Sequence, residues 1–431
     1  MKLMMNLAVI GAGFAGLVTA AVFADFKNNV WVLEKDKKKI RTLLKGKVPF
    51  YEPGLEALVS KNIKAGRLHF SHDYAKVIPP SEIIFICVGT PNKNGEVDLS
   101  ALFEAGKSIA KNLKKETMII IKSTVPPLTN QRLKDLIKKF SKVHFHLVSI
   151  PEFLREGKAI EDTLFPDRLI IGCEDKLVIK KVLKLHQPIT GQRLICSPES
   201  AQLIKYAANA FLATKISFAN AIAVLSDKLD IKADDVSKGL GMDKRIGSQF
   251  LKPGLGYGGS CLPKDVRALI SFSQKLGYNF HLLKSVERIN NDRVDYFINK
   301  LKKVFKGSLR GKKIVILGLT FKPETSDVRE ARSIEVIKKL KQLKAEIRVS
   351  DPIAIKKDKQ MFKGVKFFQN PYQALKGAEV LFLVTEWDEY KNLDFLRVKK
   401  VMKKLVVIDG RNVYNRAKLE KLGFVYLRLG K

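Results

Sequence analysis

The stretch LAVIGAGFAG, residues 7–16, indicates the fold of the first half of this chain of 431 residues. Its four apolar residues predict a strand, and its three glycines predict a tight turn into a helix that continues to Phe26. A second apolar run, residues 30–33, ends at Glu34, about twenty residues further on. Strand, glycine turn, helix and an acidic residue at the next strand end are typical of a dinucleotide-binding unit.

The same stretch indicates which dinucleotide is bound. Glycines let a pyrophosphate approach the N-terminus of the helix, where unpaired N–H groups favour anions. Glu34 can bind both ribose hydroxyls and would repel a 2′-phosphate, so we expect NAD rather than NADP. The residues expected to hold it are Gly11, Gly13, Phe14, Ala15, Gly16 and Glu34.

Alternating strand and helix patterns continue on both sides of one long helix. Apolar runs at 83–88, 118–122 and 146–150 predict a doubly wound parallel sheet, and runs at 314–317, 345–350, 380–384 and 405–408 predict a second α/β sheet. Ser197 and Pro198 predict the start of a helix that continues to about Lys228. We therefore predict two Rossmann-like domains, residues 1–196 for NAD and 301–431 for a second nucleotide, joined by a helical linker and dimerisation domain, residues 197–300.

Composition limits the function classes. The four cysteines form no CxxC pair, so we expect no disulfide framework, no metal site and a cytoplasmic location. No apolar run is long enough to span a membrane. The net charge of +36 could attract nucleic acid, but the chain lacks a nucleic-acid-binding motif. We expect a basic surface that steers anionic small molecules, with neither a specific nucleic-acid partner nor a membrane.

The stretch GLGYGGSCLPKD, residues 254–265, predicts a reactive thiol. Pro263 fits the first turn of a helix that ends near Gly277, which places Cys261 at the helix N-terminus. The dipole and free N–H groups there favour the thiolate, Lys264 favours the same anion, and Asp265 could orient a water or a base. The other cysteines, Cys87, Cys173 and Cys196, lie in apolar runs and are expected to be structural.

Polar residues at predicted strand ends are further candidates. Thr124 follows the strand at 118–122, and Glu152 and Glu156, four residues apart, would share one face of a helical turn. Lys205 and Asn209 have the same spacing on the long helix, where Lys205 either extends towards solvent or belongs to a site. Lys322 and Arg411 are candidate phosphate ligands, since arginine can bind phosphate through two hydrogen bonds.

These motifs together resemble the UDP-glucose 6-dehydrogenase branch of the UDP-glucose/GDP-mannose dehydrogenase family. The resemblance spans essentially the whole chain and rests on GAGFAG (11–16), STVP (123–126), PEFLREG (151–157), Lys205 with Asn209, GYGGSCLPKD (256–265) and FKPETSDVRE (321–330). It implies that the second nucleotide domain binds UDP, that the diphosphate sits between the halves, and that the long helix forms a homodimer interface.

The resemblance also implies the reaction, a four-electron oxidation of the sugar C6 alcohol to a carboxylate with two NAD+. Cys261 would form a thiohemiacetal and then a thioester, with Lys205 and Asn209 stabilising the oxyanion. A water held by Thr124 and Asp265, with Glu152 as base, would hydrolyse the thioester. The further residues implied at the NAD site are Lys39, Thr90, Thr124, Glu156, Lys264 and Arg329. Those implied at the UDP-glucose site are Glu152, Phe153, Leu154, Glu156, Lys205, Asn209, Arg245, Lys252, Tyr257, Gly258, Phe321, Lys322 and Arg411.

Some features leave the substrate open. Ile150 stands where the family usually has asparagine, and residues 252–254 and 261–269 also resemble the GDP-mannose branch. PEFLREG with Gly157 favours UDP-glucose; GDP-mannose and a UDP-N-acetyl-aminosugar are the alternatives. Two other classes remain: a two-electron hydroxyacid-type dehydrogenase, which would not need Cys261, and a basic polyanion-binding protein, which rests on net charge alone.

Overall fold

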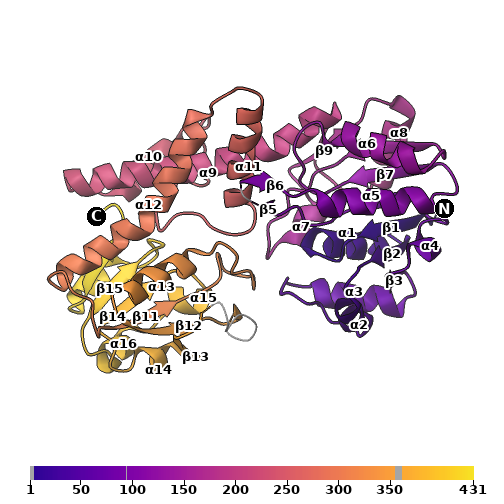
Figure 1. The fold of residues 1–431 in the computed structure, drawn as a ribbon. Coiled ribbons are helices and arrows are strands. Elements are labelled where there is room, and N and C mark those ends of the chain that lie inside the picture. The colour runs from indigo at the N-terminus through magenta and orange to yellow at the C-terminus, as the bar shows by residue number, and fades with distance from the viewer. Residues whose placement is uncertain (1–3, 94, 355–361) are drawn as a thin grey trace. The chain divides into compact units, whose positions relative to one another are not determined.

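The structure is a computed structural model that describes residues 4–93, 95–354 and 362–431. The chain forms two compact units, Met1–Ala208 with Arg267–Phe272, and Asn209–Val266 with Ser273–Lys431. Each unit contains one large sheet, coloured indigo to purple in the first unit and orange to yellow in the second (Figure 1). The division into three domains that we expect from the sequence stays a prediction.

The first sheet has eight strands in the order β10-β9-β8-β7-β4-β1-β2-β3. Their bounds are β1 Asn6–Ile10, β2 Asn29–Leu33, β3 Leu68–Ser71, β4 Ile83–Ile86, β7 Thr117–Ile121, β8 Phe145–Ser149, β9 Arg168–Gly172 and β10 Gln192–Cys196. Strands β1 to β4, β7 and β8 are parallel, as predicted. The parallel arrangement ends at β9, which is antiparallel to β8, and β10 is parallel to β9. An antiparallel neighbour needs no helical crossover, and the segment before β9 holds only a short helix, α7 Ala159–Leu164.

Helices cover both faces of this sheet because its central strands, β1, β4 and β7, are apolar on both sides. Along β1, Leu7 and Val9 pack into one core, and Ala8 and Ile10 into the other. The helices are α1 Phe14–Asp25, α2 Lys37–Leu44, α3 Leu55–Lys64, α4 Tyr74–Val77, α5 Ser100–Asn112, α6 Thr129–Phe140 and α8 Lys176–Leu185, and a small hairpin joins β5 Asn92–Lys93 to β6 Glu96–Val97. Helices α1 and α8 pack on the first face, and α5 and α6 on the second.

The predicted long helix is present as α9, Pro198–Leu229. The Ser197 hydroxyl accepts the N–H of Ser200 at 3.1 Å, which is the predicted N-cap. Three further helices follow: α10 Ala233–Met242, α11 Leu262–Lys275 and α12 His281–Val304.

In the described part of the chain, α9 is the one helix long and apolar enough to cross a membrane by length and composition. Two of its buried polar side chains nevertheless form hydrogen bonds within the protein. Ser217 donates to the Val286 carbonyl at 2.9 Å, and Asn220 accepts the N–H of Gly254 at 2.8 Å.

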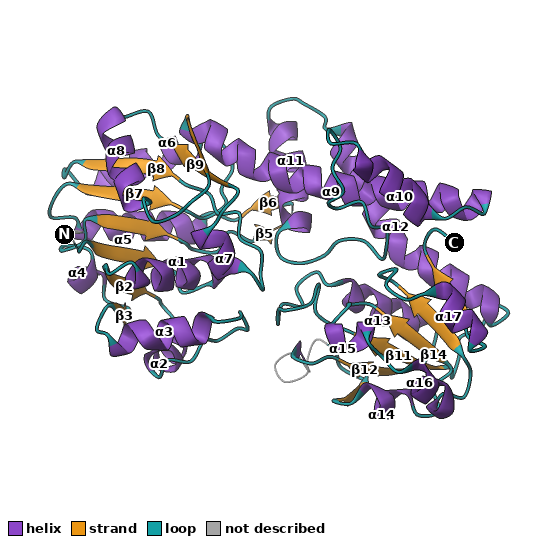
Figure 2. Cartoon of the chain, turned by 180° about the vertical axis from the view of Figure 1, so that it is seen from behind, coloured by secondary structure: helices purple, strands orange, loops and turns teal. Residues whose placement is uncertain are grey.

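The second sheet is wholly parallel, with the order β13-β12-β11-β14-β15-β16. Its strands are β11 Lys313–Leu317, β12 Glu346–Ser350, β13 Lys366–Phe368, β14 Val380–Leu383, β15 Val406–Asp409 and β16 Val425–Arg428. Its helices are α13 Arg332–Gln342, α14 Pro371–Leu375, α15 Asp388–Lys391, α16 Phe395–Val401 and α17 Arg416–Lys421. Figure 2 shows α13 on one side of this sheet and α14 and α16 on the other. The predicted α/β fold is therefore confirmed in both halves.

Candidate functional site

The glycine turn after β1 has the shape that a dinucleotide requires. Gly11 has φ +97°, and a Cβ there would lie 2.8 Å from the carbonyl oxygen of Cys87, so a larger residue is excluded. Gly13 caps α1 with no side-chain hydrogen bond, and a Cβ there would meet open space. The first N–H groups of α1 therefore lack a side-chain cap, as an anion site at a helix N-terminus requires.

Glu34 lies at the end of β2 and faces this turn. One of its oxygens, Oε2, accepts the N–H of Ala12 at 3.2 Å and pairs with Lys39 Nζ at 3.0 Å. Burial acts to raise the pKa of Glu34, but hydrogen bonds from the Asp36 N–H and from Lys39 outweigh it, and the pKa is lowered. The carboxylate is therefore held ionised beside the turn, and the structure brings the predicted residue Lys39 to it.

Two predicted threonines meet at neighbouring strand ends. Thr90 follows β4 and is buried, and its hydroxyl donates to the carbonyl of Thr124, beyond β7, at 2.7 Å. Because β4 and β7 are adjacent parallel strands, their carboxyl ends share one edge of the sheet. Thr90 and Thr124 therefore lie on the same edge as the glycine turn.

A buried ion pair follows β8. Lys205 Nζ on α9 lies 3.4 Å from Glu152 Oε1 and 5.2 Å from the centre of the Phe153 ring. Lys205 is 4% exposed, so its ammonium does not extend into solvent. The second Glu152 oxygen accepts the N–H of Leu154 at 2.6 Å.

The prediction of a helical turn that aligns Glu152 with Glu156 is wrong. Residues 151–155 are irregular, and α7 begins only at Ala159. The Glu52 side chain supplies acceptors for backbone N–H groups here: it accepts the N–H of Gly157 at 2.6 Å and that of Ala159 at 2.7 Å. Those bonds replace the carbonyl partners that a helix would supply.

Cys261 is the N-cap residue of α11, and it is exposed. Pro263 lies in the first turn, and Gly277 follows the helix with φ +78°, as predicted. Cys87 and Cys173 are buried and Cys196 is half-buried. Burial raises the pKa of Cys87 to about 12, so that thiol stays protonated and unreactive. Among the four thiols, Cys261 alone combines exposure with a helix N-terminus.

Asp265 lies one turn beyond Cys261 and is almost wholly buried. Its Oδ2 accepts a 2.6 Å hydrogen bond from the Asn209 amide, and its Oδ1 pairs with Lys264 Nζ. The structure thus brings three predicted residues, Asn209, Lys264 and Asp265, into one network. A buried carboxylate with two donors keeps a fixed orientation.

The loop before Cys261 is held by three residues that the sequence analysis did not identify. Asn220 accepts the N–H of Gly254, and Asn290 accepts the N–H of Tyr257 at 2.8 Å and donates to its carbonyl at 3.1 Å. Arg332 donates to the carbonyl of Leu255 at 3.2 Å. Both asparagines are fully buried on long helices, and an asparagine among apolar helix positions was the available signal.

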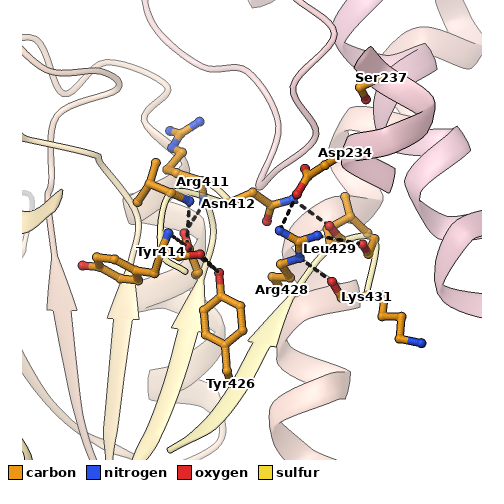
Figure 3. Close-up of polar contacts among 12 residues, drawn as sticks. Asp234, Ser237, Arg411, Asn412, Tyr414, Tyr426, Arg428, Leu429 and Lys431 are labelled. Atoms are coloured by element: carbon orange, nitrogen blue, oxygen red, sulfur yellow. Dashed lines mark hydrogen bonds and ion pairs between the residues drawn. The ribbon is translucent and has the colours of Figure 1, made fainter. Parts of the chain in front are cut away.

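Arg411 braces the same loop from the end of β15. Its guanidinium donates to three carbonyls: Val384 at 2.6 Å, Gly256 at 3.3 Å and Phe321 at 3.3 Å. Its own N–H donates to Asp409, which also accepts the N–H of Tyr414 and the phenol of Tyr426 (Figure 3). Arg411 therefore joins the glycine loop to two other strand-end loops of the second unit.

Other predicted residues lie nearer the surface. Arg245 is highly exposed and pairs with Asp243 at 2.6 Å, and Arg329 pairs with Asp327 at 2.6 Å. Lys252 is exposed, and the Lys322 ammonium lies 5.5 Å from the centre of the Phe321 ring. Lys122, just after β7, is a further buried residue that we did not single out, and burial lowers its pKa.

Comparison with known families gives matches along most of the chain. Three family models of the UDP-glucose/GDP-mannose dehydrogenase family match: the NAD binding domain at residues 5–190, the central domain at 199–292 and the UDP binding domain at 315–416.

Individual relatives match over nearly their whole length. UDP-glucose 6-dehydrogenase TuaD of Bacillus subtilis is 41% identical, over 99% of this chain and 94% of its own. UDP-glucose 6-dehydrogenase of Rhizobium meliloti is 39% identical, over 99% and 100%. Among solved structures, a UDP-glucose dehydrogenase from the archaeon Pyrobaculum islandicum has a TM-score of 0.90 at 35% identity, covering 96% of this chain and 95% of its own.

Proposed function

Because the chain belongs to the UDP-glucose/GDP-mannose dehydrogenase family, we propose that it oxidises UDP-glucose at C6 to UDP-glucuronate, with two NAD+ per sugar. The family is one of NAD-dependent oxidoreductases, and the chain is an enzyme of that class. The substrate is taken from what the relatives are named for. The observation that carries the mechanism is the exposed Cys261 at the N-terminus of α11.

The glycine turn and Glu34 fit the dinucleotide. The open N-terminus of α1 would hold the pyrophosphate, and the ionised Glu34 would accept hydrogen bonds from the ribose hydroxyls. Bound NAD+ would supply a hydride acceptor for each of the two oxidations. The residues assigned to this site are Gly11, Gly13, Phe14, Ala15, Gly16, Glu34, Lys39, Thr90, Thr124, Glu156, Lys264 and Arg329.

Cys261 would carry the sugar between the two oxidations. The first oxidation converts the C6 alcohol into an aldehyde, with loss of one proton and one hydride. The thiolate then adds to the aldehyde carbon to give a thiohemiacetal. Loss of a second hydride leaves a thioester on Cys261, which water cleaves into a carboxylate and the free thiol. A covalent carrier explains why a single active site can complete both oxidations.

The polar residues assigned to catalysis would have two roles: to stabilise the oxyanion and to activate the hydrolytic water. Lys205 and Asn209, four residues apart on α9, are donors suited to the thiohemiacetal oxyanion. Glu152 would act as the base for the hydrolytic water, with Asp265 and Thr124 orienting it. The bond from Asn209 to Asp265 gives both residues a fixed geometry before substrate binds. The residues assigned to the nucleotide sugar are Glu152, Phe153, Leu154, Glu156, Lys205, Asn209, Arg245, Lys252, Tyr257, Gly258, Phe321, Lys322 and Arg411.

The test is the amount of NADH formed per sugar consumed, measured with wild type and Cys261→Ser. We expect two NADH per UDP-glucose for wild type and a loss of turnover of at least about a thousandfold for the variant. Cys196→Ser is the matched control, since it removes a half-buried thiol whose pKa is raised by burial, and it should keep wild-type turnover. One NADH per sugar, or full turnover by Cys261→Ser, would refute the covalent mechanism and favour a two-electron dehydrogenase.

The same assay decides the substrate. GDP-mannose and a UDP-N-acetyl-aminosugar are offered separately under identical conditions. Two NADH with one of these and none with UDP-glucose would keep the Cys261 chemistry and overturn the choice of sugar. Absence of NADH with all three, together with salt-dependent DNA binding, would favour the polyanion-binding alternative.

We also propose that the chain forms a homodimer through α9. Phe211, Phe218 and Leu225 are seven residues apart, and more than half of each side chain is exposed. Residues at this spacing line one stripe of a helix, and a second copy would bury it. Sedimentation should show a dimer for wild type and a monomer for Phe218→Asp; a wild-type monomer would refute the proposal. A cytoplasmic location and the lack of specific nucleic-acid and membrane partners stay predictions.

A further inference from the structure

A cluster of two histidines and a glutamate lies at the amino ends of two strands of the first sheet. Glu116 immediately precedes β7, His144 immediately precedes β8, and His146 is the second residue of β8. Thr117 is level with Phe145 in the parallel register, which places Glu116 level with His144. Because His144 and His146 are two residues apart, their side chains leave the sheet on one face.

The side-chain atoms are close enough to share one ion. His146 Nε2 lies 3.0 Å from Glu116 Oε1, and His144 Nδ1 lies 3.9 Å from Glu116 Oε2. One ligand atom from each residue can be chosen so that all three lie within 4.8 Å of one another. Ligands about 2.1 Å from a zinc ion are about 3.4 Å apart in a tetrahedral site. The side chain of His144 is 68% exposed, so it can rotate to close the remaining gap.

A fourth residue supports the orientation of His146. The Asp175 Oδ2 lies 4.0 Å from His146 Nδ1, while its other oxygen caps α8 by accepting the N–H of Leu177 at 2.8 Å. A carboxylate on the second ring nitrogen is the usual outer partner of a metal-binding histidine. His146 Nε2 lies 3.0 Å from Glu116 Oε1, and because a carboxylate only accepts, Nε2 carries the proton in this hydrogen bond. A bound metal would replace that proton, and the neutral ring would then carry its hydrogen on Nδ1, the nitrogen nearer to Asp175.

The cluster opens onto a groove. A cavity of about 870 Å³ is lined by His144, His146 and Asp175, and also by Lys134, Lys138 and Lys142. Three protein ligands leave at least one coordination position open for water or an anion.

We propose that Glu116, His144 and His146 bind one divalent transition-metal ion, with Zn²⁺ as the reference ion. Without metal, Lys181 Nζ lies 3.4 Å from Glu116 Oε1 and would compete with the ion for this carboxylate. Cysteine spacing predicts no metal site in this chain, and this ligand set contains no cysteine. Bound metal would link the start of β7 to the start of β8 and stabilise the first unit.

The site is separate from the proposed chemistry. Thr124 and Glu152 lie beyond the carboxyl ends of β7 and β8, and the metal ligands lie at the amino ends of the same strands. Five residues of β7 at about 3.3 Å each separate the two edges by about 16 Å. Metal binding can therefore be tested without reference to dehydrogenase activity.

The experiment titrates the full-length chain with Zn²⁺ by calorimetry, after removal of metals by a chelator. We expect one equivalent to bind, and His144→Ala and Glu116→Gln each to weaken binding at least about tenfold. His144 is exposed, so its removal should leave the far-UV circular dichroism unchanged. The control His72→Ala removes an exposed histidine outside the cluster and should bind as wild type does.

Two further measurements distinguish this cluster from other zinc ligands. Lys181→Ala should tighten binding because it removes the competitor of the ion, whereas Lys180→Ala changes net charge equally and should have a smaller effect. Co²⁺ should give visible absorption without the sulfur charge-transfer band that binding at Cys261 would produce. No saturable binding up to about 1 mM Zn²⁺, or binding that His144→Ala leaves unchanged, would overturn the proposal.

Discussion

The substitution Gly256→Ala tests whether the glycine loop presents Cys261 through the Asn290 clamp. Gly256 has φ +97°, and an added Cβ would overlap Asn290 Oδ1, the atom that accepts the N–H of Tyr257. The backbone conformation costs alanine about 1–2 kcal/mol. Displacing Asn290 adds about 1–3 kcal/mol, because its two buried hydrogen bonds to Tyr257 are broken.

Gly277→Ala is the matched control. Gly277 has φ +78° and follows the C-terminus of α11, and an added Cβ there would meet nothing within 4 Å. Gly277→Ala therefore has the same free-energy cost of a positive φ, but its added Cβ overlaps no other atom. We expect Gly277→Ala to keep kcat/KM within about threefold of wild type, and Gly256→Ala to lose at least about a hundredfold, since small displacements of reacting groups cost this much.

The assay combines steady-state NADH formation with the rate of Cys261 alkylation by iodoacetamide. A displaced loop should change both measurements for Gly256→Ala and neither for Gly277→Ala. In the double variant Gly256→Ala/Asn290→Ala the overlap is absent, so the two losses should be clearly non-additive. Wild-type kcat/KM and alkylation in Gly256→Ala, or strictly additive losses in the double variant, would show that the Asn290 clamp does not position Cys261.

Three further perturbations have expected outcomes. His186 is buried, and burial lowers its pKa to about 4 from an ordinary 6.5. As pH falls, the unfolded chain therefore takes up this proton before the folded chain does. The contribution of His186 to the free energy of unfolding is full above pH 6.5 and decreases towards pH 4. Urea unfolding should lose about 2 kcal/mol between pH 7.5 and pH 5 from this group, and His186→Asn should remove that part of the pH dependence; an unchanged dependence would contradict it. Arg411→Lys replaces the three donor nitrogens of the guanidinium with one, which cannot reach all three carbonyls, so KM for the nucleotide sugar should rise at least about tenfold while KM for NAD stays constant; equal changes in both would indicate general unfolding. Glu34→Ala should raise KM for NAD about tenfold and reduce the preference for NAD over NADP; an unchanged preference would show that Glu34 does not contact the ribose.

Local patterns in the sequence were sufficient for most of the fold. Local residue preferences explain three elements: the glycine turn at residues 11–16, the apolar runs of the buried strands and the Ser197-Pro198 start of α9. Cys261 was likewise identifiable, because Pro263 defines the helix start next to it. The antiparallel direction of β9 could not be predicted, because an apolar run does not indicate which strand it pairs with or in which direction.

Other features of the fold and of the site depend on contacts between segments that are far apart in the sequence. Glu52 lies more than a hundred residues from Gly157 and Ala159, yet its carboxylate replaces the helix expected at Glu152 to Glu156. The clamp of Asn290 on Tyr257 joins segments 33 residues apart. The Glu116–His144–His146 cluster exists because β7 and β8 pair in one register.

The helices and strands, the glycine turn and the position of Cys261 at a helix N-terminus were therefore predictable from the sequence, because these features depend on short-range backbone preferences. The identity of the buried polar groups that hold the Cys261 loop, and the place where the histidines meet, depend on the three-dimensional fold. Hydrogen bonds and ion pairs act over a few ångströms in space, and separation along the chain does not indicate which groups come that close.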